Sequence, residues 1–340
     1  MKKLSAIASM ERINIKEVLQ DFIVNSLSLL IVFVGVLLLS GSASTADAMD
    51  AMEYYNRGTT YLEKGQYDQA VSDFTKALEL NPRLYQAYIN RGNVYDEKGL
   101  YDQAISDYTK AIEINPRHAG AYYNRGNVYD KKGLYDQAIS DYTKALEIKP
   151  RYGDAYYSRG TAYLDQGLYD QAISDYTKAI EIKPRYGDAY YNRGNAYCHK
   201  HLYDQAISDY TKAIEINPRF ALAYNNRGNA YYHKDQYDQA ISDYTKALEI
   251  KPRHGDAYYN RGNAYDKKGL YGQAIFDFNK ALEINPRHAK AYFNKAVACE
   301  KAGRIREAIE AYNGFIQYAS PQAASYIERV REKIRELERQ

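Results

Sequence analysis

The sequence predicts an all-α fold in which short helices repeat in pairs. A pattern of 34 residues returns eight times without an insertion, which is typical of a stacked repeat protein. In one copy, Tyr122, Gly126 and Tyr129 are spaced i, i+4 and i+7, as on one face of a helix. Gly133 and Pro150 stand where the first and the second helix of that copy must end.

The chain before the repeats is expected to form a leader of three parts. Residues 1–21 carry Lys and Arg, residues 22–39 are nearly all apolar, and residues 40–50 form a small, acidic, flexible linker. Because positive charge stays on the cytoplasmic side, residues 1–21 are predicted to be cytoplasmic and the repeats to lie across the membrane.

Two interpretations of this leader stay open. Residues 22–39 are just long enough to span the hydrocarbon as an uncleaved signal anchor, with the repeats on the extracytoplasmic side. Small residues at 43–48 instead suit a signal peptidase, which would release a secreted or periplasmic protein. The long charged segment in front of the apolar run favours the anchor.

The eight repeats occupy residues 51–320, and repeat positions are counted from the first residue of each. These first residues are Ala51, Tyr85, Ala119, Gly153, Gly187, Ala221, Gly255 and Ala289. Tyrosine is fourth and alanine twentieth in all repeats, and glycine is eighth in the first seven. One repeat cannot bury its own apolar face, so neighbouring repeats must stack.

Residues 321–340 are predicted to form a capping helix after the last repeat. Ser320 is the expected N-cap and Pro321 the first helical residue. The opposite faces of this helix differ, one charged and one apolar. The apolar face is expected to carry Ala323, Ile327, Val330, Ile334 and Leu337.

These fixed positions resemble the tetratricopeptide repeat family over 270 residues. The resemblance implies antiparallel helix pairs that coil into a right-handed superhelical solenoid, with a concave groove that binds peptides. Some members hold the terminal carboxylate of a chaperone tail with lysine and arginine at repeat positions 2, 5 and 6. Here position 5 is mostly aromatic and position 6 mostly asparagine, so chaperone-tail binding is not expected.

On a helical wheel, repeat positions 6 and 9 face away from the core and position 5 flanks them. The resemblance implies that this side of the first helix lines the concave groove. The asparagines there are Asn56, Asn90, Asn124, Asn192, Asn226, Asn260 and Asn294 at position 6 and Asn93, Asn127, Asn195, Asn229 and Asn263 at position 9. The aromatic residues at position 5 are Tyr55, Tyr123, Tyr157, Tyr191, Tyr259 and Phe293. All are candidate peptide-binding residues.

Asparagine is a poor helix former, so its regular use in mid-helix indicates a purpose. A side-chain amide both donates and accepts, so a row of amides can bind the backbone of an extended peptide while aromatic rings pack on its side chains. The groove then resembles the asparagine ladder that holds substrate peptides in O-linked N-acetylglucosamine transferase. Alternatively, the asparagines bond neighbouring repeats and were copied by duplication.

Charge narrows the expected partners. Repeat positions 2, 5, 6, 9, 12 and 13, taken together as the groove side of the first helices, carry ten acidic residues and four lysines, a net charge of −6 in a chain of net charge +3. A neutral or basic ligand is therefore favoured, and nucleic acid is not expected.

No pattern indicates a catalytic residue, a metal site or a cofactor. The segment from Cys198 to His201 lacks the three or four convergent ligands that a metal needs. His118, His254 and His288 are expected to be solvated in loops. Arginine at position 7 and aspartate at position 23 are expected to pair and set the register, contributing about 0–1 kcal/mol if exposed.

The sequence therefore favours a non-enzymatic scaffold, exported or membrane-anchored, that binds an extended segment of a partner protein. One alternative is a structural protein that oligomerises through its similar repeats, although the capping helix argues against open stacking at the C-terminal end. Another is an accessory subunit of an envelope enzyme such as a glycosyltransferase, which rests on family analogy alone.

Overall fold

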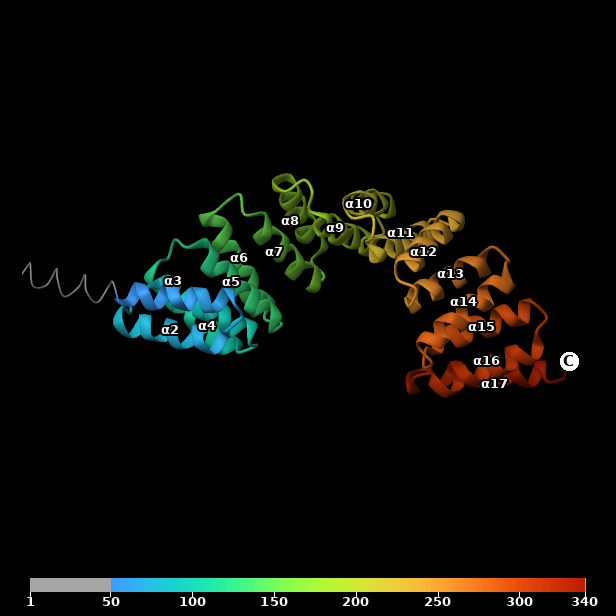
Figure 1. Cartoon of the computed structure of the whole chain (residues 1–340). Coiled ribbons are helices and arrows are strands. Elements are labelled where there is room, and N and C mark those ends of the chain that lie inside the picture. Colours follow the sequence, from blue (N-terminus) through green and yellow to red (C-terminus); the bar gives the residue numbers. More distant parts are fainter. Residues whose placement is uncertain (1–49, 340) are drawn as a thin grey trace, which may run out of the picture. The chain divides into compact units, whose positions relative to one another are not determined.

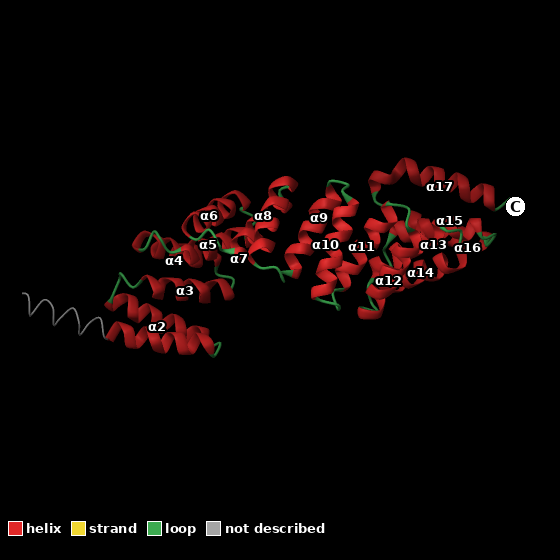
Figure 2. Ribbon diagram, turned by 90° about the horizontal axis from the view of Figure 1, so that it is seen from above, coloured by secondary structure: helices red, strands yellow, loops and turns green. Residues whose placement is uncertain are grey.

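The computed structural model describes residues 50–339 (Figure 1), so the predictions for residues 1–49 lie outside it. Over the described residues the chain forms helices and loops and no strand (Figure 2). Residues 50–63 are helical. They are followed by α2 (Tyr67–Leu80), α3 (Tyr85–Glu97), α4 (Tyr101–Ile114), α5 (Ala119–Lys131), α6 (Tyr135–Ile148), α7 (Gly153–Asp165), α8 (Tyr169–Ile182), α9 (Gly187–His199), α10 (Tyr203–Ile216), α11 (Ala221–His233), α12 (Tyr237–Ile250), α13 (Gly255–Lys267), α14 (Tyr271–Ile284), α15 (Ala289–Lys301), α16 (Ile305–Tyr318), the 3₁₀ helix η1 (Pro321–Ala323) and α17 (Ala324–Leu337).

The described helices fall into two compact bodies, one up to Val128 and one from Tyr129. In the second body each first helix of a repeat packs on its own second helix, as α7 does on α8, and each second helix packs on the next repeat, as α8 does on α9. The first body follows the same rule, with α2 on α3 and α3 on α4. The predicted all-α fold of consecutive helix-turn-helix repeats is confirmed.

The turn between the two helices of a repeat uses the left-handed backbone conformation. Gly133 has a φ of 71°, and the Leu134 N–H donates to the carbonyl of Tyr129, which closes the end of α5. His201 and Asp235 adopt the same conformation, each with a φ of 58°, although they carry side chains. Glycine, histidine and aspartate therefore stop the first helix at one repeat position.

Each repeat is packed by fitting an aromatic ring against a glycine. In the fifth repeat, a Cβ atom added to Gly194 would lie 2.7 Å from Cε1 of Tyr210, whose side chain is fully buried. Ala189, Ala196, Ala206 and Ala213 are also fully buried in this repeat. Small residues thus let the two helix backbones approach closely, and the ring at repeat position 24 fills the remaining space.

The C-terminal segment forms the predicted cap with one difference at its start. Pro321 opens the 3₁₀ helix η1 rather than the α-helix, and the Ser320 side chain makes no capping hydrogen bond. The α-helix α17 begins at Ala324 and packs on α16. Val330, Ile334 and Leu337 are buried against the last repeat, and Ile327 packs beside them.

Candidate functional site

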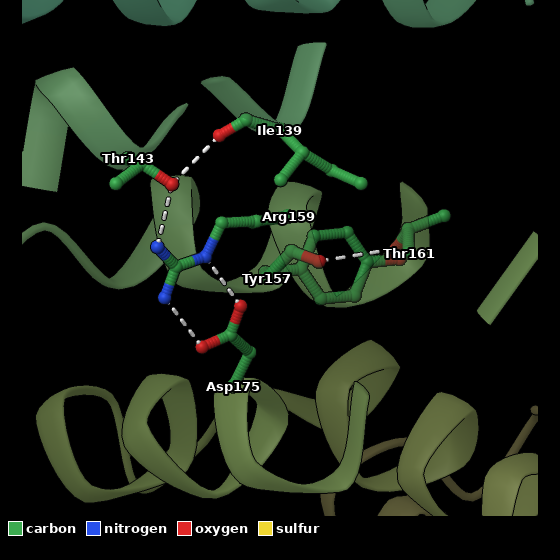
Figure 3. Close-up of polar contacts among 6 residues, drawn as sticks. All are labelled: Ile139, Thr143, Tyr157, Arg159, Thr161 and Asp175. Atoms are coloured by element: carbon green, nitrogen blue, oxygen red, sulfur yellow. Dashed lines mark hydrogen bonds and ion pairs between the residues drawn. The ribbon is translucent and has the colours of Figure 1, made fainter. Parts of the chain in front are cut away.

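An arginine–aspartate–threonine cluster links the fourth repeat to the third (Figure 3). Arg159 donates two hydrogen bonds to the carboxylate of Asp175 in its own repeat, at 2.7 and 2.8 Å. Its third nitrogen donates to the hydroxyl of Thr143 in the preceding repeat at 2.9 Å. The cluster therefore joins two helices of one repeat to the second helix of the repeat before it.

This cluster is more buried than the sequence suggested. The side chains of Arg159 and Asp175 are 17% and 7% exposed. The same bidentate pair with a threonine of the preceding repeat occurs at Arg91, Arg193, Arg227 and Arg261. The small contribution expected for an exposed ion pair does not apply here, because breaking a buried pair leaves an uncompensated charge.

The position-6 asparagines donate to the repeat that precedes them. The Asn226 amide donates to the Tyr191 hydroxyl and to the Asn195 side-chain oxygen, both at 3.0 Å. Asn294 makes the equivalent bonds to Tyr259 and Asn263. Further donors in this row are Asn90 to Tyr55, Asn124 to Asn93, Asn192 to Tyr157 and Asn260 to Asn225. Asn56, in the first repeat, is exposed.

The position-9 asparagines accept from a buried tyrosine of their own repeat. Tyr210 donates to Asn195, and Tyr108 and Tyr244 donate in the same way to Asn93 and Asn229, each at 2.8 Å. The position-6 hydrogen bonds thus join neighbouring repeats, as the alternative interpretation of the asparagines expects, whereas the position-9 bonds to tyrosine lie within one repeat. The oxygens of Asn93 and Asn195 also accept from Asn124 and Asn226 of the next repeat, which uses both of their lone pairs. What these partly exposed side chains can offer a ligand is therefore their amide N–H groups.

A cleft of about 1010 Å³ opens along the ladder in the second body. Three predicted binding residues line it, Asn195, Asn226 and Asn229. The other lining residues come from α7 to α11 and the turns between them: Leu164, Asp165, Gln166, Gly167, Tyr169, Cys198, His199, His201, Tyr203, Tyr210, Ala230 and His233.

Two smaller cavities follow along the same row of asparagines. One of about 240 Å³ is lined by Asn229, Asn260 and Asn263, and another of about 340 Å³ by Asn263, Asn294, Tyr259 and Phe293. The structure thus brings the predicted residues of the fifth to the eighth repeats to neighbouring cavities.

The cleft also contains ring pairs that the sequence analysis did not single out. Tyr169 stacks on His199 with ring centroids 4.8 Å apart and an interplanar angle of 3°. One repeat later, Tyr203 stacks on His233 at 5.1 Å and 8°. His201 contacts the Tyr203 hydroxyl at 2.9 Å. The sequence signal that could have indicated these ring pairs is histidine at position 13 of two consecutive repeats, His199 and His233.

Three histidines outside the cleft differ from the expectation that they are solvated. The His118 and His288 rings accept hydrogen bonds from the backbone N–H groups of Ala121 and Ala291, at 3.0 and 3.1 Å. His254 is only 7% exposed. Burial lowers the pKa of His118 and of His254, because a buried ring disfavours the charged form.

Ion pairs reduce the negative charge predicted for the groove. Lys183 bonds Asp154 at 2.5 Å, Lys301 bonds Asp266 at 2.9 Å, and Lys333 bonds Glu300 at 2.7 Å. Two of these lysines, Lys183 and Lys333, were not among the groove residues considered from the sequence. Within residues 50–339, no cluster of three or more His, Cys, Asp or Glu side chains is arranged to hold a metal ion.

Comparison with known proteins agrees with this architecture. A family model described as Tetratricopeptide repeat matches residues 51–84, 119–152, 153–186, 187–220, 221–254 and 255–288. A model described as TPR repeat matches residues 92–133, and a second Tetratricopeptide repeat model matches residues 74–106 and 278–310. The chain belongs to the tetratricopeptide repeat family. No curated protein sequence matches it.

Two of the similar solved structures, from Cytophaga hutchinsonii and Parabacteroides merdae, show the same fold. A repeat protein fragment from Cytophaga hutchinsonii is 21% identical, with 71% of this chain and 98% of that chain covered and a TM-score of 0.60. A tetratricopeptide repeat protein from Parabacteroides merdae is 22% identical, with 75% and 98% covered and a TM-score of 0.54. YrrB, described as a TPR protein with an unusual peptide-binding site, is 31% identical, with 54% and 95% covered and a TM-score of 0.49.

None of the helices in residues 50–339 combines the length and the apolar character that a membrane span requires. The predicted anchor, residues 22–39, precedes this range.

Proposed function

We propose that this protein is a non-enzymatic scaffold that binds an extended segment of a partner protein in the cleft between α7 and α11. The observation that carries the proposal is the composition of that cleft. Its surface combines side-chain amides, which can bond any peptide backbone, with flat ring pairs, on which side chains can pack.

The cleft residues are suited to binding rather than to nucleophilic chemistry. Cys198 lines the cleft and is the candidate nucleophile there. Burial raises the pKa of its thiol, which keeps the thiol protonated. The Tyr210 hydroxyl lies 3.4 Å from the sulfur and acts in the opposite direction on the pKa, but burial is the larger effect. A protonated thiol is a poor nucleophile, so Cys198 supports a scaffold better than an enzyme.

We further propose that residues 22–39 anchor the protein, with the repeats on the extracytoplasmic side, or else are removed by cleavage near residues 43–48. The apolar run and the basic residues before it support this proposal. The N-terminal sequence of the mature protein, after membrane fractionation, distinguishes an anchor from a cleaved signal.

End-to-end assembly is a weaker alternative because α17 covers the apolar surface of the last repeat. A molar mass in solution that grows with protein concentration would favour it over the scaffold.

The binding proposal is tested with the full chain on an array of random octapeptides. The variant Asn229→Ala removes an amide that lines the cleft, and Asn93→Ala removes the same repeat position outside it. Both variants leave a buried tyrosine hydroxyl without its acceptor, at Tyr244 and Tyr108. Because Asn93 also accepts from Asn124, the loss of stability of Asn93→Ala should be at least as large as that of Asn229→Ala, so weaker binding by Asn229→Ala alone cannot come from a greater loss of stability.

Wild type and Asn93→Ala are expected to bind a common set of peptides, and Asn229→Ala to bind them about tenfold more weakly. Equal binding by all three proteins would show that the amides serve only the contacts between repeats.

A further inference from the structure

Two carboxylates of the second body occupy a repeat position pair that elsewhere holds an ion pair. Asp130 is at position 12 of the third repeat, and Asp165 is at position 13 of the fourth. At the same two positions of the seventh and eighth repeats stand Asp266 and Lys301. There the lysine ammonium lies 2.9 Å from both carboxylate oxygens. Asp165 therefore places an acid where Lys301 places a cation.

Within residues 50–339, the carboxylate of Asp130 lacks the partner that Asp266 has in Lys301. Its Oδ1 atom is buried and has no hydrogen-bond partner among the described residues. Burial, and then the charge of Asp165, raise the pKa of Asp130, and burial raises the pKa of Asp165. A buried carboxylate oxygen without a partner is costly, so a group that brings positive charge and N–H donors would relieve it.

The surroundings of Asp165 specify what kind of cation fits. Asp165 lines the large cleft together with the stacked rings of Tyr169 and His199. A guanidinium group is flat, stacks on aromatic rings and donates two parallel hydrogen bonds to a carboxylate. A lysine ammonium would bond the carboxylates but would gain less from the flat rings.

We propose that Asp130 and Asp165 hold a basic side chain of the bound segment, with arginine preferred, in the place that Lys301 takes beside Asp266. This inference rests on the proposed function, because the side chain belongs to the segment bound in the cleft. It makes the binding selective for a basic residue at one point of an otherwise sequence-tolerant groove.

The decisive variant is Asp165→Lys, which supplies the cation from the chain itself. Lysine already stands at position 13 in Lys131, Lys267 and Lys301, so the repeat accommodates it. The matched control is Glu63→Lys, which makes the same charge change at the same repeat position but does not line the cleft. We expect Asp165→Lys to fold and to raise the urea midpoint, because its ammonium can pair with Asp130.

On the octapeptide array, wild type and Glu63→Lys should select peptides that contain arginine. Replacing that arginine by citrulline, which has the same shape without the charge, should weaken binding about tenfold to a hundredfold. Asp165→Lys should lose the same factor for the arginine peptides and nothing for the citrulline peptides. Peptides that bind equally with arginine or citrulline would overturn the inference and leave the scaffold function standing.

A second probe tests the cation position without a peptide. N-acetyl-arginine amide at millimolar concentration should raise the thermal midpoint of wild type and of Glu63→Lys, because a ligand that binds only the folded state stabilises it. It should leave Asp165→Lys unchanged, as should N-acetyl-citrulline amide for all three proteins. Stabilisation by arginine amide with no peptide bound on the array would retain the cation position and reject the scaffold. No difference between the arginine and citrulline probes would reject the cation position.

Discussion

Gly194 offers a direct test of how each repeat is packed. The substitution Gly194→Ala places a Cβ atom 2.7 Å from Cε1 and 2.9 Å from Cδ1 of Tyr210. Carbon atoms in good contact are about 3.5–4.0 Å apart, so the ring must move by roughly 1 Å. Tyr210 is only 1% exposed and has little room to move. Overpacking of this kind costs about 1–3 kcal/mol.

The same substitution also improves the helix, and a control separates the two effects. Alanine is about 1 kcal/mol better than glycine in a helix interior, so the net loss for Gly194→Ala is about 0–2 kcal/mol. Gly272 is exposed in α14, and a Cβ atom there would meet nothing within 4 Å. Gly272→Ala should therefore stabilise the protein by about 0.4–1 kcal/mol.

Urea unfolding followed by circular dichroism compares the two variants. With an m-value of ~3 kcal/mol/M, their midpoints should differ by about 0.1–1 M, with wild type between them or level with Gly194→Ala. Equal increases in both midpoints would refute the packing argument. In the eighth repeat alanine (Ala296) replaces the glycine, and the Tyr312 hydroxyl donates to Glu300 because position 9 is Val297, which cannot accept.

Three further predictions concern other parts of the repeats. Arg193→Met leaves a buried aspartate unpaired and should lower the free energy of unfolding by about 3–5 kcal/mol, measured by urea unfolding. Arg57→Met, at an arginine that is 57% exposed, should lower it less. Equal losses for the two variants would contradict the burial argument. Because burial lowers the pKa of His118 and His254, the unfolded chain takes up their protons first. The stability of the wild type should thus fall as pH drops through about 6.5. The urea midpoint of the double variant His118→Asn, His254→Asn should fall less than that of the wild type between pH 7.5 and 5. If the variant and the wild type have the same pH profile, the two histidines do not cause the pH dependence. Val330→Asp should detach α17 and cause concentration-dependent association in analytical ultracentrifugation, whereas a variant of an exposed α17 residue, Glu332→Gln, should sediment like wild type.

The fold was predictable because it depends on local signals that recur in every repeat. The 34-residue period, the helical spacing of Tyr122, Gly126 and Tyr129, and the chain breakers Gly133 and Pro150 each specify the same helix pair. Most of these signals recur in the first seven repeats, so no single deviation, such as His201 at a glycine position, changes the result.

The site was less predictable because the asparagines are nearly the same in every repeat. Which repeats open into the large cleft depends on the positions that vary, such as those of Cys198, His199 and His201. The hydrogen bonds of the ladder link residues 31 and 35 positions apart, as Asn226 does with Asn195 and Tyr191. Helical periodicity assigns a residue to a face but does not say which neighbour it bonds.

The contacts between neighbouring repeats have a consequence for how such a gene changes length. In the second body, Arg193 meets Thr177 and Arg227 meets Thr211 with the same spacing of 16 residues. If recombination between two copies excised residues 187–220, Arg227 would follow Thr177 at that spacing, and the rejoined ends would recreate the contact. Unequal crossing-over can therefore shorten or lengthen the array by whole repeats without any new interface having to evolve.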